Sequence, residues 1–172
     1  ELKGKLETFR TLNNNEIRKL NDIAKKYNIK YHNKHKLDLV DEILSNVDVI
    51  PNSIVLAQAA IESGWGKSRF ANEANNLFGI RTFDKSEKWM LPETKKTWTG
   101  WGVKVYSSKC ASVRDYVRII NEVWAYEELR AARANNPNIS AEELSMHLTR
   151  FSTNPKYTKL VINIIKTSLL TS

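Results

Sequence analysis

The sequence has little of the chemistry on which several classes of protein depend. It contains one cysteine, Cys110, so no intrachain disulfide can form, and it contains only three histidines. Two of these, His32 and His35, have the spacing of metal ligands, but no cysteine or acidic cluster accompanies them. We therefore expect no metal and no cofactor, and we interpret Cys110 as a packed side chain rather than a nucleophile.

Long apolar runs, phosphate-binding motifs and repeats are also missing. No apolar stretch of the sequence is long enough to cross a membrane. No glycine-rich phosphate-binding loop is present, and no segment is repeated or of low complexity. The 172 residues are near the usual size of a single domain and are enough to bury a core.

Basic residues are in excess. The chain has 27 lysines and arginines against 19 acidic residues, a formal net charge of +8, which favours an anionic partner such as a nucleic acid, an acidic lipid or a cell-wall polymer. The basic residues are scattered, and only short pairs such as Lys25-Lys26 and Lys95-Lys96 occur. This scatter argues against a dedicated nucleic-acid surface, so we expect no nucleic-acid partner.

Helical periodicity dominates the chain. Apolar residues recur near the helical period in 5–27 with a break at 13–15, in 37–46, in 51–62, in 112–133, and in a final helix beginning at Asn154-Pro155 that buries Leu160, Val161, Ile164 and Ile165. Ser140 and Glu143 form a capping-box pattern. Residues 87–91 and 103–106 read as strands of a small β-lobe at about 83–106. The predicted class is mainly α (α+β), with residues 1–46 as a helical segment packed on a domain formed by 47–172.

An acid stands at the end of an apolar helix. Gln58 and Glu62 are four residues apart and share a helix face, while Gly64 and Gly66 end the helix. The negative end of the helix dipole and the apolar neighbours both raise the pKa of such a carboxyl. A carboxylic acid that keeps its proton near neutral pH can act as a general acid. The alternative is that Glu62 only ends the helix or pairs with a distant arginine.

Four segments together resemble a known family. They are 57–71 (AQAAIESGWGKSRFA), 75–80 (NNLFGI), 104–117 (KVYSSKCASVRDYV) and 152–160 (STNPKYTKL). Their order and spacing resemble the glucosaminidase domain of peptidoglycan hydrolases, glycoside hydrolase family 73, and residues 112–133 are most similar to its Bax-like subgroup. The resemblance covers roughly residues 45–165. The pair Glu62-Ser63 alone is weak, because goose-type lysozymes and lytic transglycosylases share it.

The resemblance implies a lysozyme-like helical fold that cleaves the β-1,4 bond after N-acetylglucosamine in peptidoglycan glycan strands. It implies that Glu62 is the general acid and Tyr157 a catalytic groove tyrosine. Asn76 and Phe78 match the turn that shapes the groove behind the acid. Gln58 shares the helix face of Glu62, and Trp65 lies three residues beyond Glu62. We expect Gln58, Trp65, Asn76 and Phe78 to bind substrate.

The family often carries a second carboxylate on the β-lobe, in a string such as T-x-E-Y, and this chain lacks that string. Glu93 in 91–94 (LPET) is the predicted second catalytic carboxylate, because of its distance before Tyr106. Glu87 and Asp84 are alternatives. Taken alone, each of the three is more typical of a solvated surface acid.

Tryptophans on the β-lobe are further candidates. Trp98 and Trp101, together with Trp89, offer flat faces that suit sugar rings, so we expect Trp98 and Trp101 to bind substrate. The alternative is that these rings pack within the hairpin.

The expected protein is a monomeric endo-β-N-acetylglucosaminidase of the cell envelope, whether periplasmic, membrane-tethered or secreted. A membrane tether or a partner outside this chain is left open. The rival functions are a lytic transglycosylase that uses the same acid, and a catalytically silent module that binds the cell wall.

Overall fold

The computed structural model describes residues 13–29 and 36–167, which form two compact units. Unit 1 consists of residues 1–49 and 118–151, and unit 2 consists of residues 50–117 and 152–172, each within the described ranges. The predicted loop with His32 and His35, and the predicted helical turns before residue 13, lie outside the described residues. The predicted boundary between residues 46 and 47 stays a prediction.

In the described part of unit 1, the first two helices follow the predicted pattern. Helix α2 (Asn14–Lys26) starts at Asn13, whose side chain accepts a hydrogen bond from Glu16 N at 3.0 Å, while Glu16 Oε2 accepts from Asn13 N at 3.0 Å. The predicted break at 13–15 is therefore the start of this helix, because the reciprocal cap satisfies its first free N–H groups. Helix α3 (Lys36–Asn46) confirms the predicted helix at 37–46.

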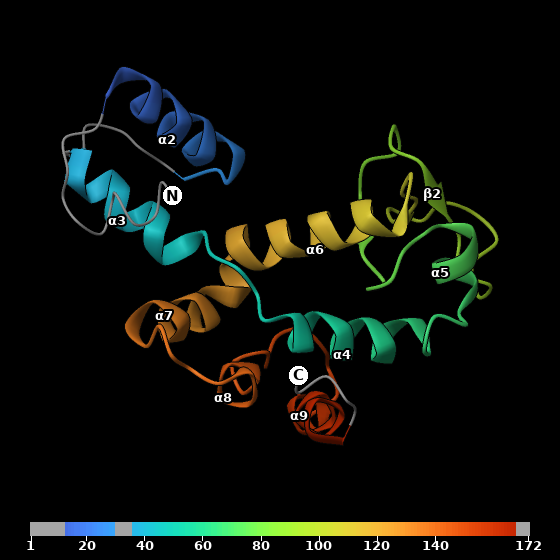
Figure 1. Ribbon diagram of the computed structural model, residues 1–172. Coiled ribbons are helices and arrows are strands. Elements are labelled where there is room, and N and C mark those ends of the chain that lie inside the picture. The colour runs from blue at the N-terminus through green and yellow to red at the C-terminus, as the bar shows by residue number, and fades with distance from the viewer. Residues whose placement is uncertain (1–12, 30–35, 168–172) are drawn as a thin grey trace. The chain divides into compact units, whose positions relative to one another are not determined.

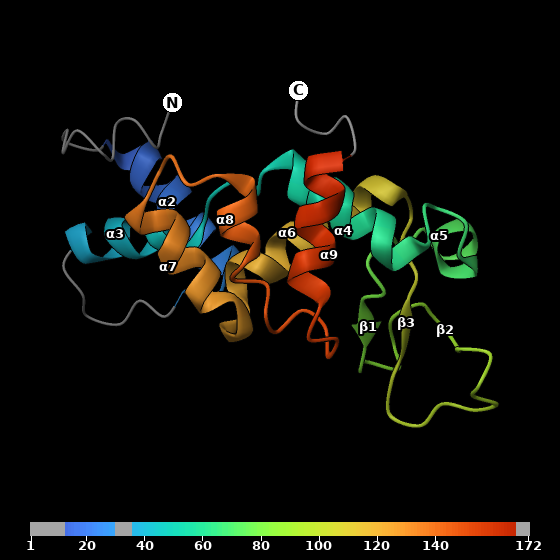
Figure 2. The same cartoon turned by 90° about the horizontal axis from the view of Figure 1, so that it is seen from below.

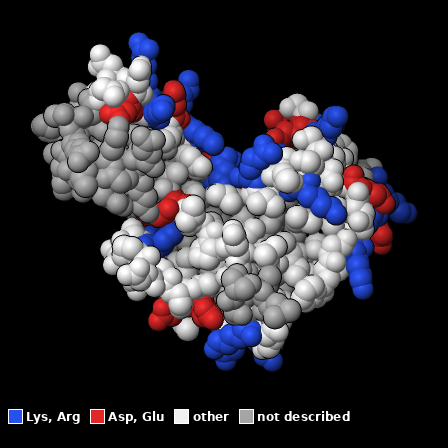
Figure 3. All heavy atoms as spheres, viewed as in Figure 1, with Lys and Arg blue, Asp and Glu red and all other residues white. Residues whose placement is uncertain are grey.

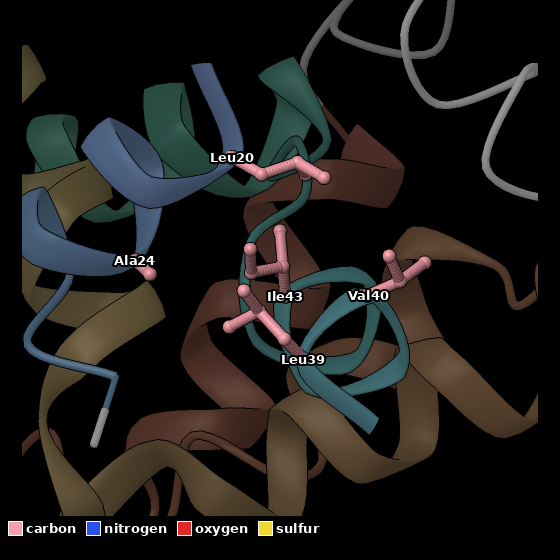
Figure 4. Close-up of a cluster of buried hydrophobic side chains, with 5 residues drawn as sticks. All are labelled: Leu20, Ala24, Leu39, Val40 and Ile43. Carbon is pink, nitrogen blue, oxygen red and sulfur yellow. The ribbon is translucent and has the colours of Figure 1, made fainter. Parts of the chain in front are cut away.

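A small apolar core joins these two helices (Figure 4). Its side chains point toward one another from α2 and α3 and are each less than a tenth exposed: Leu20, Ala24, Leu39, Val40 and Ile43. Helix α3 also packs on α7 (Glu127–Asn135). Burial of these apolar faces is the main source of stability in unit 1, since short helices are marginal alone.

The predicted continuous helix at 112–133 is wrong. The chain forms α6 (Lys109–Glu122), an extended residue at Val123, a 3-10 turn η1 (Trp124–Tyr126) and then α7. Buried Arg130 explains the break, because its Nη1 donates to the carbonyls of Ile120 at 3.0 Å and Val123 at 2.8 Å. A guanidinium can satisfy several helix-end carbonyls at once, and apolar periodicity carries no signal for such a contact. The short α8 (Ala141–Ser145) starts at the predicted Ser140–Glu143 capping box.

Unit 2 is built on two helices that pack against each other, α4 (Asn52–Ser63) and α9 (Tyr157–Thr167). Their axes run in different directions in Figures 1 and 2. The predicted helix at 51–62 is confirmed. Helix α9 begins at Tyr157, two residues after Pro155, because residues 155 and 156 form a turn in which Asn154 Oδ1 accepts from Lys156 N at 2.9 Å. Leu160 was predicted to be buried and is 41% exposed, which is a correction, whereas the other three predicted apolar residues of this helix are buried.

The β-lobe is an antiparallel sheet of three short strands in the order β1-β3-β2 (Figure 2). Strand β1 (Arg81–Thr82) pairs with β3 (Gly102–Lys104), which pairs with β2 (Trp89–Met90). The two predicted strands are confirmed in place but are shorter, and β1 was missed because two residues carry no periodicity. Together the elements confirm the predicted mainly helical α+β class.

Candidate active site

The end of α4 places Glu62 beside an unusual turn. Gly64 ends the helix in the left-handed conformation with φ +56°, and Trp65 and Gly66 follow with φ +58° and +78°. Buried Ser63 holds this turn, since its Oγ accepts from Gly66 N at 2.7 Å. A left-handed backbone is uncommon for a bulky residue such as tryptophan and marks a site of stored strain.

Trp65 is consequently turned toward solvent, and 65% of the residue is exposed. An exposed indole next to the end of the acid-bearing helix is a surface on which a sugar ring can stack. The predicted role of Trp65 in substrate binding stays a prediction.

Glu62 is half-buried, and one neighbour contacts its carboxyl in a defined way. Burial raises the pKa of Glu62 above its ordinary value, and a hydrogen bond with the Tyr157 hydroxyl opposes that rise. Tyr157 stands at the first position of α9 and is 4% exposed. The structure therefore brings together the two residues predicted as general acid and groove tyrosine, although they are 95 positions apart in the sequence (157 minus 62).

Tyr157 is an un-ionised donor at this site. Burial, first of all, raises the pKa of its hydroxyl, and the nearby Glu62 carboxyl adds to the rise, while the hydrogen bond from Gln58 lowers it. The hydroxyl therefore keeps its proton at neutral pH and can donate it in a hydrogen bond to Glu62. Tyr157 is buried, and its hydroxyl lies beside Glu62.

Gln58 extends this arrangement into the core. Its Nε2 donates to Tyr157 Oη at 2.9 Å, and its Oε1 accepts from Tyr116 Oη at 2.5 Å. Gln58 is 0% exposed and Tyr116 is 1% exposed, and both of these polar groups are satisfied. Tyr116 is the participant that sequence reasoning missed; its place in the matched segment 104–117 was the available signal.

Asn76 and Phe78 make contacts within the chain. Buried Asn76 donates from Nδ2 to the carbonyls of Ile80 and Lys104, both at 2.8 Å, and so fastens its turn to β3. Phe78 stacks on Tyr116 with ring centroids 4.2 Å apart. Both side chains contact other residues of the chain, which suits a supporting role; direct contact with substrate stays a prediction.

The β-lobe carboxylates lie in different environments. Glu93 is exposed, with 85% of its side chain accessible, and its Oε1 is 3.8 Å from Arg69 Nε. Glu87 accepts from Lys104 Nζ at 2.8 Å, a bond that lowers its pKa, and exposed Asp84 accepts from Ser86 Oγ at 2.7 Å. The Glu93 side chain is more exposed than that of Glu87, and its ion pair with Arg69 is long.

The β-lobe tryptophans are half-buried and contact other side chains. Trp98 lies against Trp89 with ring centroids 4.8 Å apart, and both approach Gly102, where an added Cβ would come within 2.9 Å of Trp89. Trp101 has two cations on its ring, Arg81 at 4.0 Å and Lys95 at 3.6 Å from the centroid. These contacts fit the alternative of packing within the lobe; sugar binding by Trp98 and Trp101 stays a prediction.

No group of three or more His, Cys, Asp or Glu side chains within 13–29 and 36–167 could hold a metal ion. Over the same ranges, no helix combines the length and apolarity that a membrane span needs.

Comparison with known proteins identifies relatives for most of the chain. Residues 37–170 match the glucosaminidase family, described as mannosyl-glycoprotein endo-beta-N-acetylglucosaminidase. Protein bax of Escherichia coli (strain K12) is 34% identical over 145 residues, which cover 82% of this chain and 51% of that protein. Peptidoglycan hydrolase FlgJ of the same strain is 29% identical over 147 residues, which cover 76% of this chain and 44% of FlgJ. The chain thus spans about half the length of the curated relatives it matches.

A solved structure shares the fold. The catalytic domain of the autolysin Auto from Listeria monocytogenes matches with a TM-score of 0.55 and 19% identity, over 98% of this chain and 92% of that domain. At this identity the likeness concerns the fold alone.

Proposed function

Because this chain belongs to the glucosaminidase family of glycoside hydrolases, we propose that it cleaves the β-1,4 bond after N-acetylglucosamine in peptidoglycan glycan strands. The single observation that carries the proposal is the half-buried Glu62 carboxyl, with its raised pKa, bonded to the Tyr157 hydroxyl. A relative named as a peptidoglycan hydrolase supports the choice of substrate. Action on this polymer puts the protein at the cell envelope, and we propose that it works there as a monomer.

The reaction begins with proton transfer from Glu62 to the glycosidic oxygen, as the bond from that oxygen to the sugar C1 breaks. The positive charge that develops at C1 needs a second group, either a β-lobe carboxylate or the N-acetyl oxygen of the substrate. Water then supplies a hydroxyl to C1 and returns a proton to Glu62. Tyr157 keeps its hydrogen bond to Glu62 throughout and stabilises the carboxylate that forms when the proton leaves.

Glu93 is the proposed β-lobe carboxylate. Its ion pair with Arg69 is exposed and therefore weak, so the carboxylate can leave it to approach a substrate. The charge of Glu87 is offset by Lys104, and Asp84 is bonded within its own turn. Substrate assistance by the N-acetyl group is the alternative, and substitution of these acids distinguishes the two.

The product ends test the reaction type. Purified peptidoglycan digested with this protein should release fragments with reducing N-acetylglucosamine ends, identified by mass spectrometry. Anhydro-muramic ends would instead identify a lytic transglycosylase. Protein that pellets with peptidoglycan and releases no fragment would identify a binding module and overturn the proposal.

A further inference from the structure

Gln58 is fully buried, yet both ends of its amide are engaged beside the proposed acid. It lies one helical turn before Glu62 on α4, and it contacts Tyr157 from α9 and Tyr116 from α6. A side chain with 0% exposure presents no atom to a substrate in this arrangement. Any influence of Gln58 on the reaction must therefore pass through its two tyrosine partners.

The directions of these hydrogen bonds follow from the donors available. The Gln58 NH2 group can only donate, so the Tyr157 oxygen accepts from it and the single Tyr157 proton is left for Glu62. Tyr116 donates to Gln58 Oε1 and so fixes which end of the amide faces Tyr157. The stack of Phe78 on Tyr116 holds that ring in place.

We infer that Gln58 is a positioning residue for Glu62: it holds the Tyr157 hydroxyl as a donor to the Glu62 carboxyl, and Tyr116 in turn holds the Gln58 amide. This inference rests on the proposed function of Glu62 as the general acid. The oxygen of Glu62 that accepts from Tyr157 is kept as an acceptor, so the acidic proton resides on the other oxygen. The network thus fixes where the proton is offered.

The same network affects the proton affinity of Glu62. Burial raises the pKa of Glu62, and the Tyr157 bond is the opposing influence. Within the described residues, no lysine, arginine or second carboxylate from α4, α6 or α9 contributes to that shift. Loss of the Tyr157 bond should therefore raise the pKa further. Since a general acid must be protonated, the alkaline limb of the pH–rate profile should then move to higher pH.

A double-mutant cycle with Tyr157 tests the inference on a soluble peptidoglycan fragment of defined length. Gln58→Met keeps the length of the side chain but removes the amide. We expect it to lower kcat by about tenfold, the value of roughly one hydrogen bond, with KM changed by less than about twofold. In the Tyr157→Phe background the same substitution should change kcat by less than about twofold, because its partner hydroxyl is already gone. Both single variants should also shift the alkaline limb upward.

Tyr116→Phe can replace Gln58→Met in the double-mutant cycle with Tyr157→Phe. It tests the inference if Gln58→Met does not fold. It keeps the ring that stacks on Phe78 and should likewise lose its effect on kcat in the Tyr157→Phe background. Tyr106→Phe is the matched control, because Tyr106 is a buried tyrosine of unit 2 whose hydroxyl donates to Asp115 at 2.7 Å, outside this network. The control should leave the alkaline limb in place.

Effects on kcat that multiply in the double variants, or a rise in KM with no shift of the limb, would overturn the inference. Glu62→Gln separates this failure from failure of the proposed function. If Glu62→Gln is inactive but the effects of the double-mutant cycle are additive, Glu62 remains the general acid and only the positioning role of Gln58 is refuted. An active Glu62→Gln removes the general acid and the positioning role together.

Discussion

At the scale of single residues, the sequence points to individual candidate side chains but not to the hydrogen bonds between them. Glu62 was predicted as a site residue from its helix-end position and apolar neighbours, and Tyr157 from a family resemblance, and the structure brings these two side chains into contact. The hydrogen bonds from Tyr116 through Gln58 to Tyr157 could not be predicted, because they depend on side-chain orientation. They also join distant parts of the chain: Tyr116 is 58 positions from Gln58, and Tyr157 is 99 positions from it. Periodicity identifies which face of a helix is buried, and it does not report which polar group meets which.

The β-lobe acids give a test at this scale. We expect Glu93→Gln to lower turnover of peptidoglycan more than Glu87→Gln or Asp84→Asn, because Glu93 has only a long, exposed ion pair, whereas Glu87 is bonded to Lys104 and Asp84 to Ser86. Turnover should be measured for all three variants with folding checked by circular dichroism. Near-normal turnover in each of them would assign the second role to the N-acetyl group of the substrate.

The proposed acid should cost the protein stability at neutral pH. Burial raises the Glu62 pKa above its ordinary value of 4.5, so below that pH the group is protonated in both folded and unfolded chains. As the pH rises from 4.5 through the folded pKa, the unfolded chain releases its proton first and folding stability is lost. Glu62→Gln cannot ionise and escapes this loss.

The Tm of Glu62→Gln relative to the unsubstituted protein should therefore be higher at pH 7 than at pH 4. Thermal melts of both proteins at the two pH values measure this difference. A difference that is the same at both pH values, or larger at pH 4, would show that the pKa of Glu62 is not raised by folding.

At the scale of elements, the start of α8 was predictable because the Ser140–Glu143 capping box marks it. The break between α6 and α7 was not, because a buried arginine rather than a glycine or proline closes the end of α6. Arg130 also donates from Nε to Asn46 Oδ1 at 2.8 Å, so the same side chain ties α7 to the end of α3. A positive charge in an apolar helical pattern usually predicts a solvated face, and this contact is the exception.

Arg130→Met should therefore destabilise unit 1. It leaves the carbonyls of Ile120 and Val123 without the guanidinium, and we expect a loss of about 2 to 4 kcal/mol, since hydrogen bonds to charged groups are each worth about 1.5 to 3 kcal/mol. Urea unfolding measures the loss. Arg114→Met is the matched control, because Arg114 is an exposed arginine of α6, the helix whose last carbonyls Arg130 contacts. Equal stability of the two variants would contradict this explanation of the break.

At the scale of the whole molecule, periodicity predicted the helical class and composition gave the basic charge, but neither predicted the two compact units. Unit 1 combines the N-terminal helices with residues 118–151, and unit 2 combines residues 50–117 with the C-terminal helix. A segment that returns to an earlier part of the chain leaves no mark in local periodicity. The domain boundary predicted between residues 46 and 47 relied on local pattern alone.

The net charge of +8 has a measurable consequence. On the face drawn in Figure 3, basic side chains are spread over the surface with acidic ones among them. We expect binding to an anionic cell-wall polymer to weaken as salt increases, because exposed charges are screened beyond about 10 Å at 0.1 M salt. Co-sedimentation of Glu62→Gln with purified walls at low and high salt measures this without digestion. Binding that is equal at both salt concentrations would rule out a charge-driven encounter.

In the proposed reaction, Glu62 supplies the proton that cleaves the glycosidic bond. The most direct test is the turnover of purified peptidoglycan by Glu62→Gln, with Glu128→Gln at an exposed position of α7 as the control. Gln has the same shape but carries no acidic proton, so we expect Glu62→Gln to remain folded and to lose about 100- to 10,000-fold in turnover. Glu128→Gln should cleave normally. Turnover by Glu62→Gln within a few-fold of the unsubstituted protein would contradict the account.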